Sequence, residues 1–201
     1  MKGLIIKDLL TLKNQRIFYL VFIALIALVF NVSALVVVMM AAGIPRVALA
    51  FDEQCKWDLL AGALPCTVLQ LVLSKYVLGL MATLSTVLLA ITVWLAKMLL
   101  NVAQQSFIEL MVYIAAGLVV NLLLQGISLP LILRIGAERG CLLGLSAVTL
   151  ALLVLLIIAA AGAYNGPVVI VIISALAFIA VAVYLVSIPL SLRAYRLRYR
   201  T

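Results

Sequence analysis

Histidine is missing from this chain of 201 residues, and only six residues are aspartate or glutamate. The lack of histidine removes the commonest proton shuttle, general base and metal ligand. The sequence has no GxxxxGK phosphate loop ending in Ser or Thr, and no GxGxxG motif follows a strand. The three cysteines, at positions 55, 66 and 141, show no metal-ligand spacing, and their odd number favours free thiols. We therefore expect no catalytic residues, no metal site and no cofactor in this chain.

Apolar residues are abundant instead, at 69% of the chain, with a mean hydropathy of +1.41. Soluble domains are about half apolar, so this composition predicts an integral membrane protein. No polar stretch is long enough to build its own core, and we expect one membrane domain over residues 1–201. The net charge of +8 does not indicate nucleic-acid binding, because the basic residues flank hydrophobic spans.

The apolar runs predict an all-α fold of six transmembrane helices, with both chain ends in the cytoplasm. Residues 17–50 allow either one long span or a hairpin of two short spans that turns near Asn31 and Ser33. The hairpin is favoured because it leaves only Lys97 of the 14 basic residues outside, as the positive-inside rule requires. The later spans, together covering residues 77–190, are expected at 77–97, 107–133, 141–162 and 167–190, before a basic tail at 191–201.

Residues 1–16 have the pattern of an amphipathic helix, clearest over residues 2–16. Ile5, Leu9 and Leu12 recur at helical spacing and form an apolar face. The basic side consists of Lys2, Lys7, Lys13 and Arg16. Such a helix lies along the lipid headgroups, which we favour over the alternative of a positive flank to the first span.

A polar segment at residues 51–76 interrupts the apolar sequence and is too long for a simple hairpin loop. Pro65 divides it into a short helix through Trp57 and a helix from about Thr67 that leads into the third span. Its carboxylates are Asp52, Glu53 and Asp58. Mixed charge around Trp57 suits docking to a protein better than contact with an anionic membrane surface. The alternative is an interfacial helix anchored by Trp57 and Tyr76.

Asn121 and Gln125 lie four residues apart on the predicted fourth span and therefore share one face. They either form hydrogen bonds between helices or line a polar translocation path. Helix packing is the commoner role of such residues in membranes, and it is the interpretation we favour.

The motifs in their order resemble a known family. The segments are KGLIIKDLLTLKNQ at residues 2–15, DEQCKWD at 52–58, ALP at 63–65 and LSKYVLGL at 73–80. This sequence resembles permease subunits of type 2 ABC exporters, and more narrowly the membrane subunits of staphylococcal phenol-soluble modulin exporters. The family pattern is filled here by Asp52, Glu53, Lys56, Trp57, Leu64, Pro65, Leu73, Ser74, Lys75, Tyr76, Leu78 and Gly79.

The resemblance implies a permease without its own ATPase domain, in the plasma membrane of a bacterium. ATP and Mg would bind a separate nucleotide-binding subunit, and a second permease copy would complete the transporter, with a homodimer favoured over a heterodimer. Residues 2–16 would form the elbow helix and Asp52 to Leu64 the coupling helix between the second and third spans. The residues implied in coupling to the ATPase are Asp52, Glu53, Lys56, Trp57, Asp58, Leu64 and Pro65, with Ser74, Lys75 and Tyr76 at the start of the third span.

The cargo implied by the resemblance is an amphipathic, membrane-active peptide. The apolar spans suit a lipid or another hydrophobic substrate equally well. Two other functions remain open from the residues alone. One is a carrier that works without ATP, although the sequence lacks a charged residue near mid-membrane; the other is an assembly factor that recruits a cytoplasmic protein.

Overall fold

The computed structural model describes residues 2–11, 21, 34–57, 67–100, 106–136, 139–140 and 166–199. All regular elements in these residues are helices. They are α1 (Lys2–Thr11), α3 (Ala34–Met39), the 3-10 helix η1 (Met40–Ala42), α4 (Gly43–Gln54), α6 (Val68–Leu99), α7 (Phe107–Ile135) and α9 (Gly166–Tyr199). The described residues therefore agree with the prediction of an all-α chain.

Four stretches are long and apolar enough to cross a membrane, which needs about 20 residues. The first of them joins three elements, α3, η1 and α4, into one rod. The backbone stays in the right-handed helical region at Met39 and at Gly43, so the rod continues through η1. The four candidate spans are Ala34–Gln54, Val68–Leu99, Phe107–Ile135 and Ile173–Leu197. The chain is a multi-pass membrane protein on this evidence.

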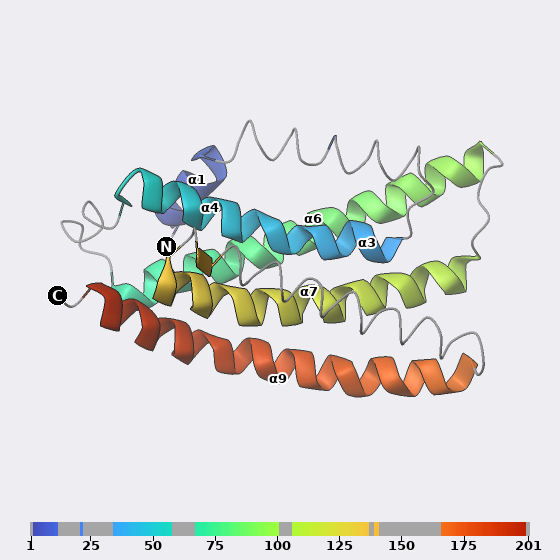
Figure 1. Cartoon of the computed structure of the whole chain (residues 1–201). Helices are drawn as coiled ribbons and strands as arrows, with labels where there is room; N and C mark the ends of the chain where they lie inside the picture. Colours follow the sequence, from blue (N-terminus) through green and yellow to red (C-terminus); the bar gives the residue numbers. More distant parts are fainter. Residues whose placement is uncertain are drawn as a thin grey trace.

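The long helices lie side by side, and the short helix α1 packs at one end of the bundle (Figure 1). We call this the α1 end; α4, α7 and α9 finish there and α6 begins there. The core at the α1 end contains Leu49, Val72, Tyr76, Leu129, Ile132, Leu133, Tyr184 and Ala194. The core at the opposite end contains Ala34, Val37, Val38, Ala90, Leu110 and Ile114.

Capping boxes fix where α6 and α7 begin. The Thr67 side chain accepts a hydrogen bond from the backbone of Gln70, whose side chain accepts one from Thr67 in return. Ser106 and Glu109 form the same arrangement before α7. Each box satisfies backbone N–H groups that have no partner within the helix. The predicted helix start near Thr67 is confirmed.

Three helices continue beyond the apolar runs of the sequence. The rod that ends with α4 extends past residue 50 to Gln54, and α6 extends from Val68 to Leu99. α9 continues through most of the predicted basic tail to Tyr199. Ser191 and Ala194 are buried on this last part of α9, so packing against the core holds it helical although its other side is basic.

The directions of the described helices constrain the path of the chain. α7 and α9 both run from the opposite end to the α1 end, so the chain must return to the opposite end between them (Figure 1). α1 lies at the α1 end while α3 begins at the opposite end, which requires another crossing. The predicted first span, its turn at residues 31–33 and the span at 141–162 lie outside the described residues. Six spans stay a prediction with which these helix directions agree.

Candidate functional site

Four charged side chains from three separate segments meet at the α1 end. Lys75 Nζ lies 2.8 Å from Asp8 Oδ1 and 2.5 Å from Asp52 Oδ2. Lys7 Nζ lies 3.1 Å from Asp8 Oδ1 and also pairs with Asp52 Oδ1. Each lysine therefore contacts both aspartates, and the four residues form a closed ring, which we call the ion ring.

The ion ring is buried and electrically neutral. The side chains of Asp8, Asp52 and Lys75 are at most 10% exposed, and that of Lys7 is 23% exposed. Two lysines balance two aspartates, so no formal charge remains uncompensated. Removing one member of a buried ion pair is strongly destabilising, because the remaining charge stays buried without its partner.

The ion ring stands at the base of the connection between α4 and α6. Asp52 belongs to the last turn of α4, and Lys75 belongs to the second turn of α6. Their contact joins the two ends of the predicted polar segment at residues 51–76. Lys7 and Asp8 reach the same place from α1, whose Leu4 is also buried. Sequence positions far apart thus meet between the end of α4 and the start of α6.

Trp57 lies directly beside the ion ring. The Lys7 ammonium is 4.2 Å from the centre of the Trp57 ring, within the range of a cation–π interaction. A pocket next to this contact is lined by both charged and apolar side chains. Its polar lining comes from the ion ring with Glu53, Trp57, Ser74 and Tyr195, and its apolar lining includes Leu4, Leu49, Leu71, Val72, Ile132 and Leu133.

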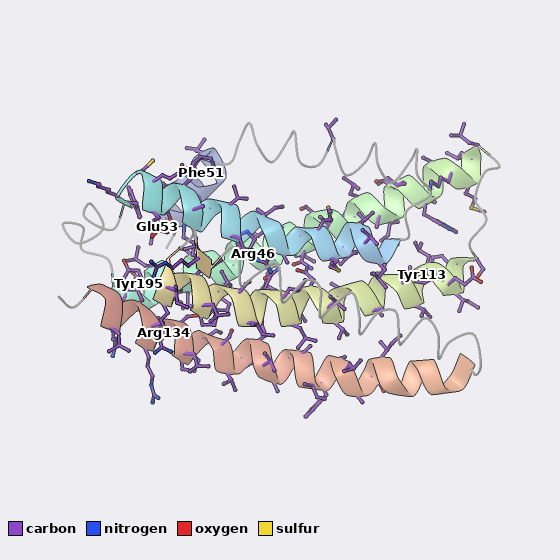
Figure 2. The ribbon with its side chains drawn as sticks, viewed as in Figure 1. Arg46, Phe51, Glu53, Tyr113, Arg134 and Tyr195 are labelled. Carbon is purple, nitrogen blue, oxygen red and sulfur yellow. The ribbon has the colours of Figure 1, made fainter. Side chains whose placement is uncertain are left out.

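The turn after α4 is exposed. Gln54, Cys55 and Lys56 are open to solvent, and Cys55 is a free thiol. Lys56 has a φ of 49°, in the left-handed region that glycine usually occupies after a helix. Figure 2 shows Glu53 at this end of the bundle, together with Arg134 and Tyr195 from α7 and α9.

The residues predicted to couple to an ATPase divide into four groups. Lys56 is exposed, while Glu53 and Trp57 are partly buried. Asp52 is 8% exposed and bound within the ion ring, so its carboxylate faces Lys7 and Lys75. Asp58, Leu64 and Pro65 lie outside the described residues, as does most of the predicted coupling helix from Asp52 to Leu64.

The residues predicted at the start of the third span all point into the bundle. Ser74 donates to the Leu71 carbonyl oxygen at 2.8 Å, and Lys75 belongs to the ion ring. The Tyr76 hydroxyl lies 2.8 Å from both Ser187 Oγ and Ser191 Oγ on α9. These contacts tie the start of α6 to the end of α9.

A second tyrosine strengthens this link between α6 and α9. The Tyr184 hydroxyl donates to the Tyr76 carbonyl oxygen at 3.2 Å. The two rings lie 5.3 Å apart and nearly perpendicular, an edge-to-face arrangement favoured by aromatic pairs. Lys75 and Tyr76, neighbours on one turn of α6, therefore make polar contacts with α1, α4 and α9.

Asn121 and Gln125 form a hydrogen-bonded network between α6 and α7. Asn121 Nδ2 donates to Thr83 Oγ1 at 3.0 Å, and Gln125 Nε2 donates to Asn121 Oδ1 at 3.0 Å. Gln125 Nε2 also lies 3.4 Å from the Gly79 carbonyl oxygen. Both amide side chains are fully buried. This geometry is that of the helix-packing alternative.

Sequence reasoning missed Asp8 and misjudged Lys7. Lys7 was assigned to a basic side of residues 2–16 that faces headgroups, but it points inward to the ion ring. Asp8 was given no role. One signal was present in the sequence: Asp8 follows Leu4 by one helical turn and so shares its face. The structure buries both side chains.

A model of the family described as ABC-2 family transporter protein matches residues 3–196, nearly the whole chain. The match includes the ion ring, three candidate spans in full, and all but one residue each of α1 and of the fourth candidate span. Comparison with curated proteins and with solved structures found no match.

Proposed function

This chain belongs to the ABC-2 transporter family, and from that we propose that it is the permease subunit of an ATP-driven exporter. As a member, it is a membrane transport component and not itself a catalyst. ATP and Mg bind a separate nucleotide-binding subunit in this proposal. The observation that carries it is the family match over residues 3–196 together with the ion ring at one end of an apolar bundle.

The ATPase docks at the α1 end, on the connection between α4 and α6. The exposed turn at residues 54–56 and the partly buried Trp57 present polar, charged and aromatic groups there. Tryptophan is frequent among the residues that contribute most to protein interfaces. Lys56 and Glu53 supply charges of opposite sign beside it.

Charge distribution supports a cytoplasmic location for the α1 end. Exposed arginines gather there, as cytoplasmic loops and helix ends usually show. They are Arg134, Arg139, Arg193 and Arg196. Lys97 lies near the opposite end, in the last turn of α6. Both chain termini are then cytoplasmic, in the plasma membrane of a bacterium.

The cargo is an amphipathic peptide or another hydrophobic molecule, and two copies of the chain form the permease. The outward faces of α6 and α9 are rich in exposed apolar side chains, including Leu84, Leu88, Phe178 and Leu185. Exposed apolar surface of this kind suits lipid chains, a hydrophobic cargo or a second membrane subunit. The family resemblance and this apolar surface together support export, a peptide cargo and a homodimer.

The docking proposal is tested by purifying the tagged chain in detergent with the proteins of its own operon. We expect an ATPase in stoichiometric amount, and we expect Trp57→Ala to reduce its binding at least tenfold. Trp57→Phe is the matched variant, because it keeps an aromatic ring over Lys7 and should retain most of the binding.

Membrane insertion and the elution volume of the purified chain are measured for both variants. Loss of the ATPase with unchanged insertion supports docking at this connection. An ATPase that binds Trp57→Ala as tightly as the parent places docking elsewhere. Purification without any ATPase would contradict the exporter function itself.

A further inference from the structure

The ion ring closes the base of the connection between α4 and α6. Asp52 and Lys75 lie at the two ends of that connection, and their charged groups are 2.5 Å apart. The predicted ATPase contacts lie between them in the sequence. α4 and α6 also pack through apolar side chains, Leu49 against Val72 and Tyr76 and Ala48 against Leu78. The Asp52–Lys75 contact adds a charged link between them at the ends that face the connection.

We propose that the Asp52–Lys75 side of the ion ring is a clamp that makes α4 and α6 respond together when the connection moves. Lys7 and Asp8 of α1 add one charge of each sign beside the clamp and hold α1 against it. Asp52 and Lys75 are thus positioning residues for transport, and docking of the ATPase does not depend on them. This inference rests on the proposed function and adds a mechanical role that docking alone does not require.

The contacts within the ring predict which combined substitutions are tolerated. Every lysine touches every aspartate, so replacing one lysine and one aspartate leaves an opposite pair in contact. Replacing both aspartates leaves two buried lysines, and replacing a single residue leaves three charges that cannot balance. Buried charges without partners are costly. Mixed double variants should therefore insert and fold better than the single variants they combine.

Exchange of the two charges should fail, in contrast to an isolated ion pair. In Asp52→Lys/Lys75→Asp, the new lysine would lie beside Lys7 and the new aspartate beside Asp8. Both contacts would become repulsive. A ring of four charges therefore predicts no rescue by exchange, whereas an independent Asp52–Lys75 pair predicts rescue.

Two mixed double variants separate the clamp from the rest of the ring. Asp52→Asn/Lys75→Met removes the ion pair between α4 and α6 and leaves Lys7 paired with Asp8. Lys7→Met/Asp8→Asn uses the same substitutions and leaves Asp52 paired with Lys75. In both variants the remaining pair is neutral. Only the second variant keeps an ion pair between α4 and α6. Arg196→Gln, an exposed change at the same end, is the control for loss of one charge.

The measurement is a distance between spin labels in the complete complex with its ATPase. Cysteines replace the exposed Met40 and Leu88 in a chain whose three native cysteines are serines. Distances are recorded without nucleotide and after trapping with ATP and vanadate. We expect a nucleotide-dependent change in the parent and in Arg196→Gln. In Asp52→Asn/Lys75→Met the distance change should be at least threefold smaller than in the parent. In Lys7→Met/Asp8→Asn it should remain more than half of the parent's change.

Binding of the ATPase is measured on the same samples and should be unchanged in Asp52→Asn/Lys75→Met, which keeps Lys7 over Trp57. Lys7→Met/Asp8→Asn removes that cation, so its distances are recorded at an ATPase concentration that saturates it. Equal distance changes in the two doubles would overturn the clamp, and so would failure of the mixed doubles to insert in the membrane. Rescue by the Asp52→Lys/Lys75→Asp exchange would show an isolated pair and also overturn it. A parent complex with no ATPase, or with no response to ATP, would instead refute the proposed function.

Discussion

At the scale of single residues, Gly79 allows α6 and α7 to share the Asn121–Gln125 network. A Cβ atom at position 79 would lie 2.4 Å from Gln125 Oε1 and 3.1 Å from Gln125 Cδ. Gln125 is fully buried, so its amide can move only by breaking contacts with Gly79, Thr83 or Asn121. The absence of a side chain at position 79 is therefore a condition for the network.

We expect Gly79→Ala to lower the free energy of unfolding by about 1–3 kcal/mol, the usual cost of overpacking a buried contact. Titration with SDS in mixed micelles measures this difference. Gly3→Ala is the control, since no atom lies within 4 Å of its added Cβ. The cost of Gly79→Ala should be smaller when Gln125 is already alanine, because the obstacle is then gone. It is measured by comparing Gly79→Ala/Gln125→Ala with Gln125→Ala. Equal losses would show that Gln125 is not the obstacle.

Asn121 distinguishes packing from a translocation path. Its amide donates to Thr83 and accepts from Gln125, and it is fully buried. We expect Asn121→Leu to cost about 1 kcal/mol of stability, since hydrogen bonds between helices in membranes contribute roughly 0.6–2 kcal/mol. The distance change that ATP produces in the complex should be retained. A stable variant that keeps that change but no longer transports cargo would favour the path alternative.

At the scale of helices, close approach depends on small residues at the contacts. A Cβ at Gly117 of α7 would lie 2.9 Å from the Leu35 carbonyl oxygen and 3.0 Å from Val38 Cβ on α3. A Cβ at Gly126 would meet α9 at 3.3 Å or more. The first obstacle is backbone, which cannot rotate away as a side-chain end can. Helices in membranes commonly use small residues in this manner.

We therefore expect Gly117→Ala to destabilise the bundle by about 3 kcal/mol and Gly126→Ala by less than about 1.5 kcal/mol. The same SDS titration measures both variants. The order of the two values is the test, because both substitutions add one methyl group within the same helix. A larger loss for Gly126→Ala would contradict the close packing of α3 on α7.

Helix starts were predictable from the sequence, whereas helix ends and the ion ring were not. Thr67 with Gln70, and Ser106 with Glu109, are local patterns that a reader of the sequence can recognise. The end of α9 depends on Ser191 and Ala194 packing against distant helices. Asp8 and Lys75 are 67 positions apart in sequence. From the sequence alone, each of these charges is interpreted as a charge that flanks its own apolar span, and their contact is not predicted.

The helix α1 shows how tertiary contacts reverse a pattern read in isolation. Its buried side carries Leu4 and Asp8, while Ile6 and Leu10 are more than half exposed. An amphipathic helix on a membrane surface normally turns its charges to water. Here part of its charge faces the bundle and its exposed apolar residues are free to contact lipid. The helix over residues 2–11 was predictable; which side it buries required its partners in α4 and α6.

At the scale of the whole molecule, the two ends of the bundle differ in charge and in what they expose. The α1 end carries the ion ring, the exposed arginines and the turn with Cys55. The opposite end carries Lys97 and Glu109 near the ends of α6 and α7. This asymmetry predicts the orientation of the whole bundle in the membrane, because cytoplasmic ends are enriched in lysine and arginine.

Cysteine labelling tests this orientation directly, because Cys55 is exposed at the α1 end and Leu99 is 84% exposed at the end of α6. One chain keeps Cys55 with Cys66 and Cys141 changed to serine; the other has all three changed and carries Leu99→Cys. A membrane-impermeant maleimide added to intact cells should label the Leu99→Cys chain and leave Cys55 unmodified. In inside-out vesicles Cys55 should react instead. The reverse pattern would place the exposed turn and Trp57 outside the cell, where no ATP-binding subunit could reach them, and would refute the exporter function together with the orientation.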